Sequence, residues 1–197
     1  MRKLSLLVAC VTLPTAALAA TPSEGVALEV RRGFFTETDI GGFFTLGGDN
    51  AYSNLQTYLQ LGVGYDLSQT VEIGAHFGMG SNAANCWSGA DAKGDCKLSD
   101  NFTVTFADVT AAYLFSLAER LYVAPKLALG YTLLDPAPVN DNAGNPIKAG
   151  INVGFGASGE YATSMDHFSI GLDVMARYVL GPNMLSLQFY PRVKYTF

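Results

Sequence analysis

The stretch at residues 55–67, LQTYLQLGVGYDL, decides the fold because two kinds of side chain alternate along its whole length. One set reads Leu, Thr, Leu, Leu, Val, Tyr and Leu, and the intervening set reads Gln, Tyr, Gln, Gly, Gly and Asp. In a β-strand, successive side chains point to opposite faces, so a period of two indicates a strand. The stretch therefore predicts a strand with one apolar face and one polar or very small face.

The same alternation recurs along most of the chain. Residues 71–80 alternate in this way after only three intervening residues, which predicts a tight hairpin with the first stretch. Further alternating segments lie at 34–46, 102–115, 121–134, 151–161, 168–180 and 185–197. Their lengths are close to the ~9–11 residues that a tilted transmembrane strand requires. The prediction is an all-β fold, an eight-stranded antiparallel up-and-down transmembrane β-barrel with a filled polar lumen.

A few positions fit this pattern less well. Phe43 interrupts the polar face of the first segment, and the apolar phase of the fourth shifts between Phe106 and Val109. A β-bulge or a strand end outside the membrane would account for the shift. Pro125 and Pro191 each remove a backbone donor from the predicted ladder, and we interpret them as local defects in a closed barrel.

A soluble barrel would also alternate, so other features must identify the face that meets lipid. Glycine is abundant on the polar face, and aromatic residues gather at the ends of the apolar face, as in a narrow filled lumen with interfacial aromatic girdles. Unpaired charges in a low-dielectric interior are costly, so charges of opposite sign are expected to pair there. The predicted lumen charge network consists of Glu37, Asp39, Glu72, Asp108, Lys126, Glu160, Asp173, Arg177, Arg192 and Lys194.

The N-terminus has the pattern of an export signal. Arg2 and Lys3 precede an apolar run, and small residues at 17 and 19 suit a signal peptidase. We predict a cleaved signal peptide at 1–19, a periplasmic lead-in at 20–33 and the outer-membrane barrel at 34–197. An alternative reading makes residues 7–10 a lipobox with Cys10 acylated, but it leaves a short apolar region.

Without Cys10, the exported chain keeps Cys86 and Cys96, which predict a disulfide in an oxidising compartment. The rival reading, a zinc site, lacks the usual four ligands. Alternating turns place the connections at 47–54, 81–101, 135–150 and 181–183 outside the cell, and those at 68–70, 116–120 and 162–167 in the periplasm. The longest outer loop holds the candidate recognition residues Trp87, Asp91 and Lys93. The alternative is a loop that the disulfide merely protects from proteases.

Composition and motifs argue against several function classes. The 197-residue chain has a net charge of −5 and no basic patch, so nucleic acid is not an expected partner. An eight-stranded barrel is filled by side chains, so a diffusive pore is not expected either. We predict no catalytic residue, cofactor or metal. For Asp135 and Asp141, a solvated loop is favoured over a calcium site because no EF-hand spacing is present.

One enzymatic alternative remains open. The segment His167-Phe168-Ser169 has the His-x-Ser spacing of the lipid A deacylases, and this spacing predicts that both side chains share one strand face. In the predicted topology the pair lies at the periplasmic end with Ser169 facing inward, which does not suit an outer-leaflet substrate. His76 is interpreted as a hydrogen-bonded lumen histidine.

The C-terminal residues add a further expectation. Phe189, Val193, Tyr195 and Phe197 fall on one face of the last segment and resemble the C-terminal assembly signal of bacterial outer-membrane barrels. This resemblance implies the barrel assembly machinery as a partner during biogenesis, with outer-membrane lipid and lipopolysaccharide around the mature barrel.

The chain from residue 20 onward resembles small outer-membrane barrels of the OmpA and OmpX type. The residues Arg32-Gly33, the stretch DIGG at 39–42 and the stretch LQLGVGYD at 59–66 are similar to the myxobacterial gliding motility protein family CglE. This resemblance implies a non-enzymatic component of contact-dependent gliding motility that works with other envelope proteins. It transfers no catalytic residue.

Overall fold

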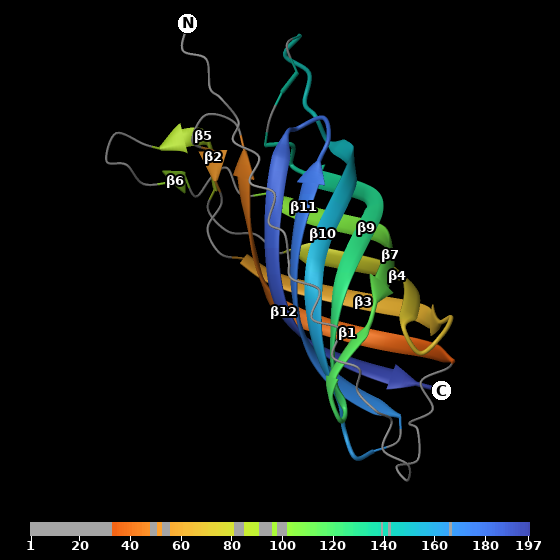
Figure 1. Ribbon diagram of the computed structural model, residues 1–197. Coiled ribbons are helices and arrows are strands. Elements are labelled where there is room, and N and C mark those ends of the chain that lie inside the picture. The colour runs from red at the N-terminus through yellow and green to blue at the C-terminus, as the bar shows by residue number, and fades with distance from the viewer. Residues whose placement is uncertain are drawn as a thin grey trace, which may run out of the picture.

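Eight long antiparallel strands form a closed barrel in the computed structural model (Figure 1). The structure describes residues 33–47, 51–52, 56–80, 85–90, 96–97, 102–138, 140–141, 143–165 and 167–197. The barrel strands are β1 (Phe34–Gly47), β3 (Gln56–Asp66), β4 (Val71–Gly80), β7 (Thr103–Tyr113), β9 (Leu121–Asp135), β10 (Ala149–Ala162), β11 (Phe168–Val179) and β12 (Met184–Thr196). The predicted eight-stranded all-β barrel is confirmed.

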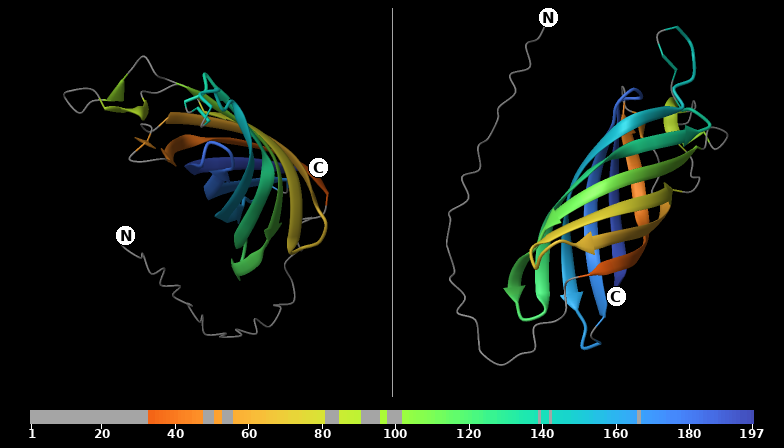
Figure 2. Two further views of the ribbon diagram at one scale, coloured as in Figure 1. Left: turned by 90° about the horizontal axis from the view of Figure 1, so that it is seen from above. Right: turned by 90° about the vertical axis from the view of Figure 1, so that its right-hand side faces the viewer.

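The barrel closes through the pairing of its first and last strands. Asp39 on β1 lies opposite Arg192 on β12, and the remaining strands pair with their neighbours in chain order. Closure satisfies the hydrogen-bonding groups that an open sheet would leave at its edges. The strands tilt strongly as they wind around the barrel (Figure 2). Within the described part of the chain, no helix is long and apolar enough to cross a membrane.

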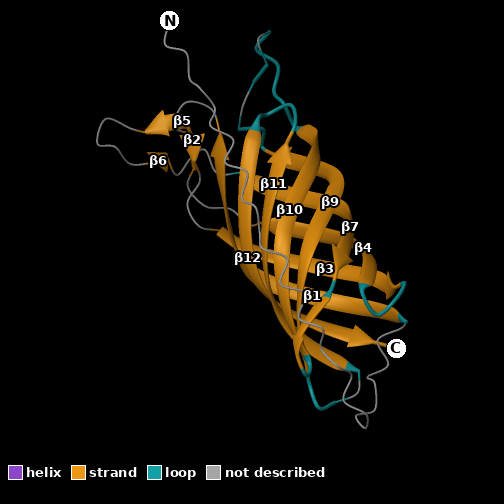
Figure 3. Cartoon of the chain, in the orientation of Figure 1, coloured by secondary structure: helices purple, strands orange, loops and turns teal. Residues whose placement is uncertain are grey.

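The two ends of the barrel differ in their connections. Turns at 67–70, 119–120 and 163–167 lie at one end, together with Phe34 and Phe197, and we call this the hairpin end. The strand ends at Gly47, Gln56, Gly80, Thr103, Asp135, Ala149, Val179 and Met184 lie at the other, which we call the loop end. The short strands β5 (Asn85–Ala90) and β6 (Cys96–Lys97) form a separate ribbon there, beside β2 (Ala51–Tyr52) (Figure 3).

The two strand prolines, Pro125 and Pro191, both lie at gaps in the hydrogen-bonded ladder between strands. The pairing of β7 with β9 ends at Ala112 and Lys126, next to Pro125, and β8 (Phe115–Ala118) then resumes it at Phe115. The pairing of β1 with β12 skips two positions next to Pro191. Proline has no N–H to donate, so each gap is local, and the barrel still closes around it.

The barrel has the inverse polarity of a soluble protein. Its outward side chains are largely apolar and about half exposed, as Leu127 (60%) and Phe155 (64%) illustrate. Charged side chains face inward, where Arg177 is fully buried. A contiguous apolar exterior of this size marks a surface that another apolar phase covers.

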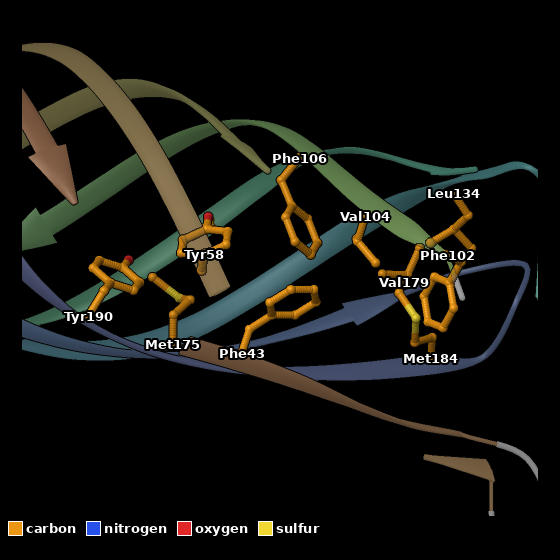
Figure 4. Close-up of a cluster of buried hydrophobic side chains, with 11 residues drawn as sticks. Phe43, Tyr58, Phe102, Val104, Phe106, Leu134, Met175, Val179, Met184 and Tyr190 are labelled. Carbon is orange, nitrogen blue, oxygen red and sulfur yellow. The ribbon is translucent and has the colours of Figure 1, made fainter. Parts of the chain in front are cut away.

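The lumen is only partly polar, which corrects the prediction of a polar interior. Toward the loop end it is filled by an apolar plug of buried side chains (Figure 4), comprising Phe43, Tyr58, Phe102, Val104, Phe106, Ala128, Leu134, Met175, Val179, Met184 and Tyr190. Phe43 faces inward as a member of this plug, and this explains why an aromatic residue interrupts the polar face of its strand. The expected bulge near Phe106 was wrong, because β7 keeps a continuous register with both neighbours while Val104 and Phe106 face the lumen.

Glycine makes room for the largest plug residues. A Cβ atom at Gly80 would collide with the ring of Phe43, and one at Gly78 would collide with the ring of Tyr58. A Cβ atom at Gly41 would instead collide with the backbone of Phe189 and Tyr190. The abundance of glycine on the inward face thus follows from the narrow lumen of an eight-stranded barrel, which cannot hold two bulky side chains at one level.

Candidate functional site

The lumen near the hairpin end and the middle of the barrel contains a network of charged side chains. Each is at most 7% exposed. The network includes every predicted charged residue: Glu37, Asp39, Glu72, Asp108, Lys126, Glu160, Asp173, Arg177, Arg192 and Lys194. They come from seven of the eight barrel strands, and they face inward because the strand alternation places them on the same side as the lumen glycines.

Arg192 is the hub of this network. Its Nη2 donates to Glu160 Oε2 at 2.8 Å and to Ser158 Oγ at 3.0 Å, and its Nη1 lies 3.4 Å from Glu37 Oε2. Asp173 Oδ1 lies 3.7 Å from Arg192 Nε. A guanidinium presents five N–H donors in a rigid fork, so one arginine can hold several carboxylates from different strands.

Two lysines neutralise further carboxylates. Lys194 Nζ donates to Glu72 Oε2 at 2.5 Å and to Asp66 Oδ1 at 3.1 Å, and it lies 4.0 Å from the centroid of the Phe35 ring. Lys126 Nζ donates to Asp173 Oδ2 at 2.6 Å. These contacts tie β3, β4 and β12 together at the hairpin end and join β9 to β11 across the lumen.

A second group lies beneath the apolar plug. Arg177 Nε donates to Asp108 Oδ2 at 2.6 Å, while its guanidinium carbon lies 5.1 Å from the centroid of the Phe106 ring. Arg177 Nη2 also reaches Gln60 Oε1 at 3.3 Å, and Gln60 Nε2 donates to Asp39 Oδ2 at 2.5 Å. This group therefore links the charged part of the lumen to the plug.

His76 takes part in the network through both ring nitrogens. Its Nε2 lies 2.5 Å from Glu37 Oε1, and Thr110 Oγ1 lies 3.3 Å from its Nδ1. A carboxylate, an imidazole and a hydroxyl in this order resemble the arrangement that activates a nucleophile. Here the imidazole and the carboxylate are buried within the filled lumen, so the geometry supports a structural hydrogen-bonded histidine.

Sequence reasoning missed several members of the network. Asp66 has the same inward parity as Glu72 and lies opposite it across the hairpin, which was the available signal. Gln60 and Tyr58 were recognisable only as inward-facing polar residues, and their contacts depend on strands remote in sequence. Among the described residues, no group of three or more His, Cys, Asp or Glu side chains is arranged to hold a metal ion.

The predicted outer-loop residues are only partly within the described structure. Asp91 and Lys93 lie outside the described residues, and Trp87 belongs to β5. Asn85 pairs with Lys97 and Ala90 pairs with Cys96, so Cys86 and Cys96 lie on neighbouring strands of the β5–β6 ribbon but are not paired with each other in its register. The ribbon has an irregular register between Asn85 and Ala90.

The residues of the predicted C-terminal assembly signal face outward. Phe189, Val193 and Phe197 are each at least half exposed. Tyr195 stacks against Phe168 and Phe197 with ring centroids 4.9 and 5.0 Å apart. The last residue is anchored, because Phe197 N donates to Phe34 O at 2.9 Å. At the hairpin end, an aromatic cluster thus connects the start of β1, the first barrel strand, with the end of β12, the last one.

The His-x-Ser pair is not assembled into a site. Ser169 is buried on the lumen side of β11, whereas His167 is exposed in the preceding turn, where its Nδ1 bonds Thr196 O at 2.7 Å. The expectation that both share one strand face was wrong, because His167 lies before β11 begins and does not follow its alternation.

Solved structures of outer-membrane barrels have this fold. Neisserial surface protein A has a TM-score of 0.60 at 14% identity, covering 84% of this chain and 97% of that one. Ail, the attachment invasion locus protein of Yersinia pestis, in complex with the heparin analogue sucrose octasulfate, has a TM-score of 0.52 at 10% identity, covering 84% and 99%. The outer-membrane enzyme PagL has a TM-score of 0.48 at 13% identity, covering 83% and 99%. At these identities the likeness shows the fold alone.

Neither a family model nor a curated protein matches the sequence. The resemblance to outer-membrane barrels of the OmpA and OmpX type is therefore supported by structure, and the CglE resemblance is not supported.

Proposed function

We propose that the protein is a non-enzymatic barrel of the outer membrane that acts in cell-surface structure or recognition. The observation that carries this proposal is the inverted polarity of the barrel, with an apolar exterior around a charged, buried lumen. In water that exterior would expose dozens of large apolar side chains, whereas a bilayer would cover them.

The filled lumen argues against transport. The apolar plug and buried polar side chains such as Thr45, Asn152 and Gln188 occupy the loop-end half, and the charge network occupies the rest. A solute would have to displace both, and breaking buried ion pairs is costly. The surface that remains for function is therefore the set of loop-end connections, which in this proposal face outward from the cell.

The charge of those connections indicates a partner class. In the outer loops predicted from the sequence, six Asp residues (49, 91, 95, 100, 135 and 141) stand against three Lys residues (93, 97 and 148). The Ail complex contains a sulfated, strongly anionic ligand. Acidic loops would repel such a ligand. We therefore propose that the partner, which belongs to another surface or is another protein, is neutral or cationic.

A deletion strain tests this proposal. Loss of the gene should change surface adhesion, cell–cell contact or surface movement, and it should leave the lipid A acylation profile unchanged in mass spectrometry. An altered acylation profile would favour the lipid A-modifying alternative. The motility role that the CglE resemblance implies would appear as a change in surface movement of the deletion strain.

Membrane insertion is tested separately with purified protein. The folded barrel should fractionate with outer membranes and migrate differently on gels before and after heating. Recovery of the folded protein in the soluble periplasmic fraction without detergent would contradict the proposal.

A further inference from the structure

A groove of about 770 Å³ crosses the outer wall of the barrel from β1 to β10. Its volume lies within the ~300–1,000 Å³ range of small-molecule sites. Most of its lining side chains belong to the outward apolar surface, including Tyr65, Ile73, Leu127 and Val153. The groove is thus a hollow in the same surface that the proposed membrane would cover.

The groove follows one row of paired residues across five consecutive strands. The residues of this row are Gly64, Gly74, Thr110, Ala128 and Gly154, each directly opposite the next. All five are lumen-facing positions, and none carries a bulky side chain. Gly64 and Gly74 leave room on the lumen side of the wall for Phe35 and His76, which pack against this row.

The outward residues beside this row give the groove its shape. On β4 and β7 these outward residues form two pairs, Ile73 with Ala111 and Ala75 with Val109, so each pair sets one alanine beside a larger apolar side chain. Larger side chains border them on each side, with Val63 and Tyr65 on β3 and Leu127 and Leu129 on β9. Ala75 and Ala111 are therefore the smallest outward side chains of the lining, and larger apolar side chains surround them.

The chemistry of the lining selects a hydrocarbon ligand. Thr110 and Tyr65 are the polar side chains among the lining residues, and the backbone of the paired row is engaged in the ladder. A ligand with polar groups would leave them without hydrogen-bond partners inside the groove, at a cost of desolvation. A flexible apolar chain loses nothing there.

The direction of the groove indicates where that chain enters. One end lies at Phe34 and Tyr65, close to the hairpin end, and the other lies at Leu129 and Val153, in the middle of β9 and β10. In the proposed orientation the hairpin end faces the periplasm. Aromatic side chains favour the headgroup level of a membrane, so Phe34 and Tyr65 suit the entrance.

We propose that this groove is a binding site for one acyl chain of a phospholipid from the periplasmic leaflet. The proposal rests on the membrane location proposed above. It assigns a defined ligand to the β4–β7 face, in contrast to the exchangeable lipid that would surround the rest of the barrel.

Native mass spectrometry of the full-length protein, extracted from outer membranes in mild detergent, tests this site. The wild-type barrel should retain one phospholipid adduct. Ala75→Phe and Ala111→Phe fill the groove and should abolish the adduct. Ala107→Phe is the matched control, since Ala107 is also an outward alanine on β7 but does not line the groove, and this variant should retain the lipid.

Folding of each variant is checked by heat-modifiable migration, and Ala111→Leu provides a milder filling if phenylalanine prevents assembly. A wild-type barrel without adduct, or equal retention in all variants, would overturn the proposal. A dimer that dissociates in the groove variants would assign the groove to a second copy and also overturn it. Failure of membrane location would appear differently, as folded protein that needs no detergent.

Discussion

Asp108 and Arg177, 69 positions apart in sequence, meet in the lumen with Arg177 Nε 2.6 Å from Asp108 Oδ2. Arg177 is fully buried and Asp108 is 5% exposed. Neither charge can reach water, so each depends on the other. The pair also lies against Phe106, which places it at the boundary between the charge network and the apolar plug.

Removing one partner of this pair should destabilise the barrel strongly. Arg177→Met leaves Asp108 buried without its cation, and we expect a loss of about 3–5 kcal/mol in the free energy of unfolding. The measurement is urea unfolding of the barrel in lipid vesicles. The double variant Arg177→Met/Asp108→Leu should recover most of the loss, because no unpaired charge remains; a double variant as unstable as the single one would contradict this account.

The apolar plug should contribute stability through packing. Phe106→Ala removes a buried ring from the plug, and we expect a loss of about 3–5 kcal/mol in the free energy of unfolding. Phe155→Ala is the control, since Phe155 is 64% exposed on the outer wall, where lipid fills the space that the ring leaves. Equal losses in the two variants would show that the plug is not a packed core.

Gly80 should be intolerant of even one methyl group. Gly80→Ala places a Cβ against the Phe43 ring, and overpacking of this kind costs about 1–3 kcal/mol. Gly159→Ala is the matched control, because its nearest neighbouring atom is 4.0 Å away. Phe43→Leu combined with Gly80→Ala should restore part of the stability in the same unfolding assay. No recovery would mean that the clash with Phe43 is not the cause.

The loop at 136–148 should respond to pH through Asp141. Hydrogen bonds from the Asn145 backbone and side chain, and from the Ala143 backbone, lower the pKa of Asp141 below its ordinary value. A carboxyl whose pKa is lower in the folded loop stabilises that loop at neutral pH, and the contribution disappears as the pH falls through the folded pKa. Asn145→Ala removes the side-chain donor, so the pKa of Asp141 should rise without regaining its ordinary value, as measured by NMR titration.

The two cysteines of the exported chain, Cys86 and Cys96, predict a disulfide. Protein from an oxidising compartment should resist thiol alkylation until it is reduced. Cys86→Ser should free Cys96 for alkylation and increase proteolysis within the 81–101 loop, because an open loop has more conformational freedom. Complete alkylation of the unreduced wild-type protein would contradict the pairing.

The sequence alone determined the strands, their number and the side on which each charge lies. Alternation is a local property of extended backbone, so it can be read within one segment such as residues 55–67 without knowledge of the rest. The inward positions of Glu72 and Lys126 follow from this parity, and the tight hairpin at 68–70 follows from chain spacing.

Only the tertiary structure decided what fills the lumen. Phe43 and Phe106 broke the expected pattern because both rings pack against Tyr58 in the plug, an arrangement that depends on barrel closure and register. Arg192 meets Glu160 for the same reason. The outer groove is likewise non-local, since its lining residues come from six strands, β1, β3, β4, β7, β9 and β10. Parity assigns a side chain to a face, whereas its height and partners depend on how all eight strands are staggered.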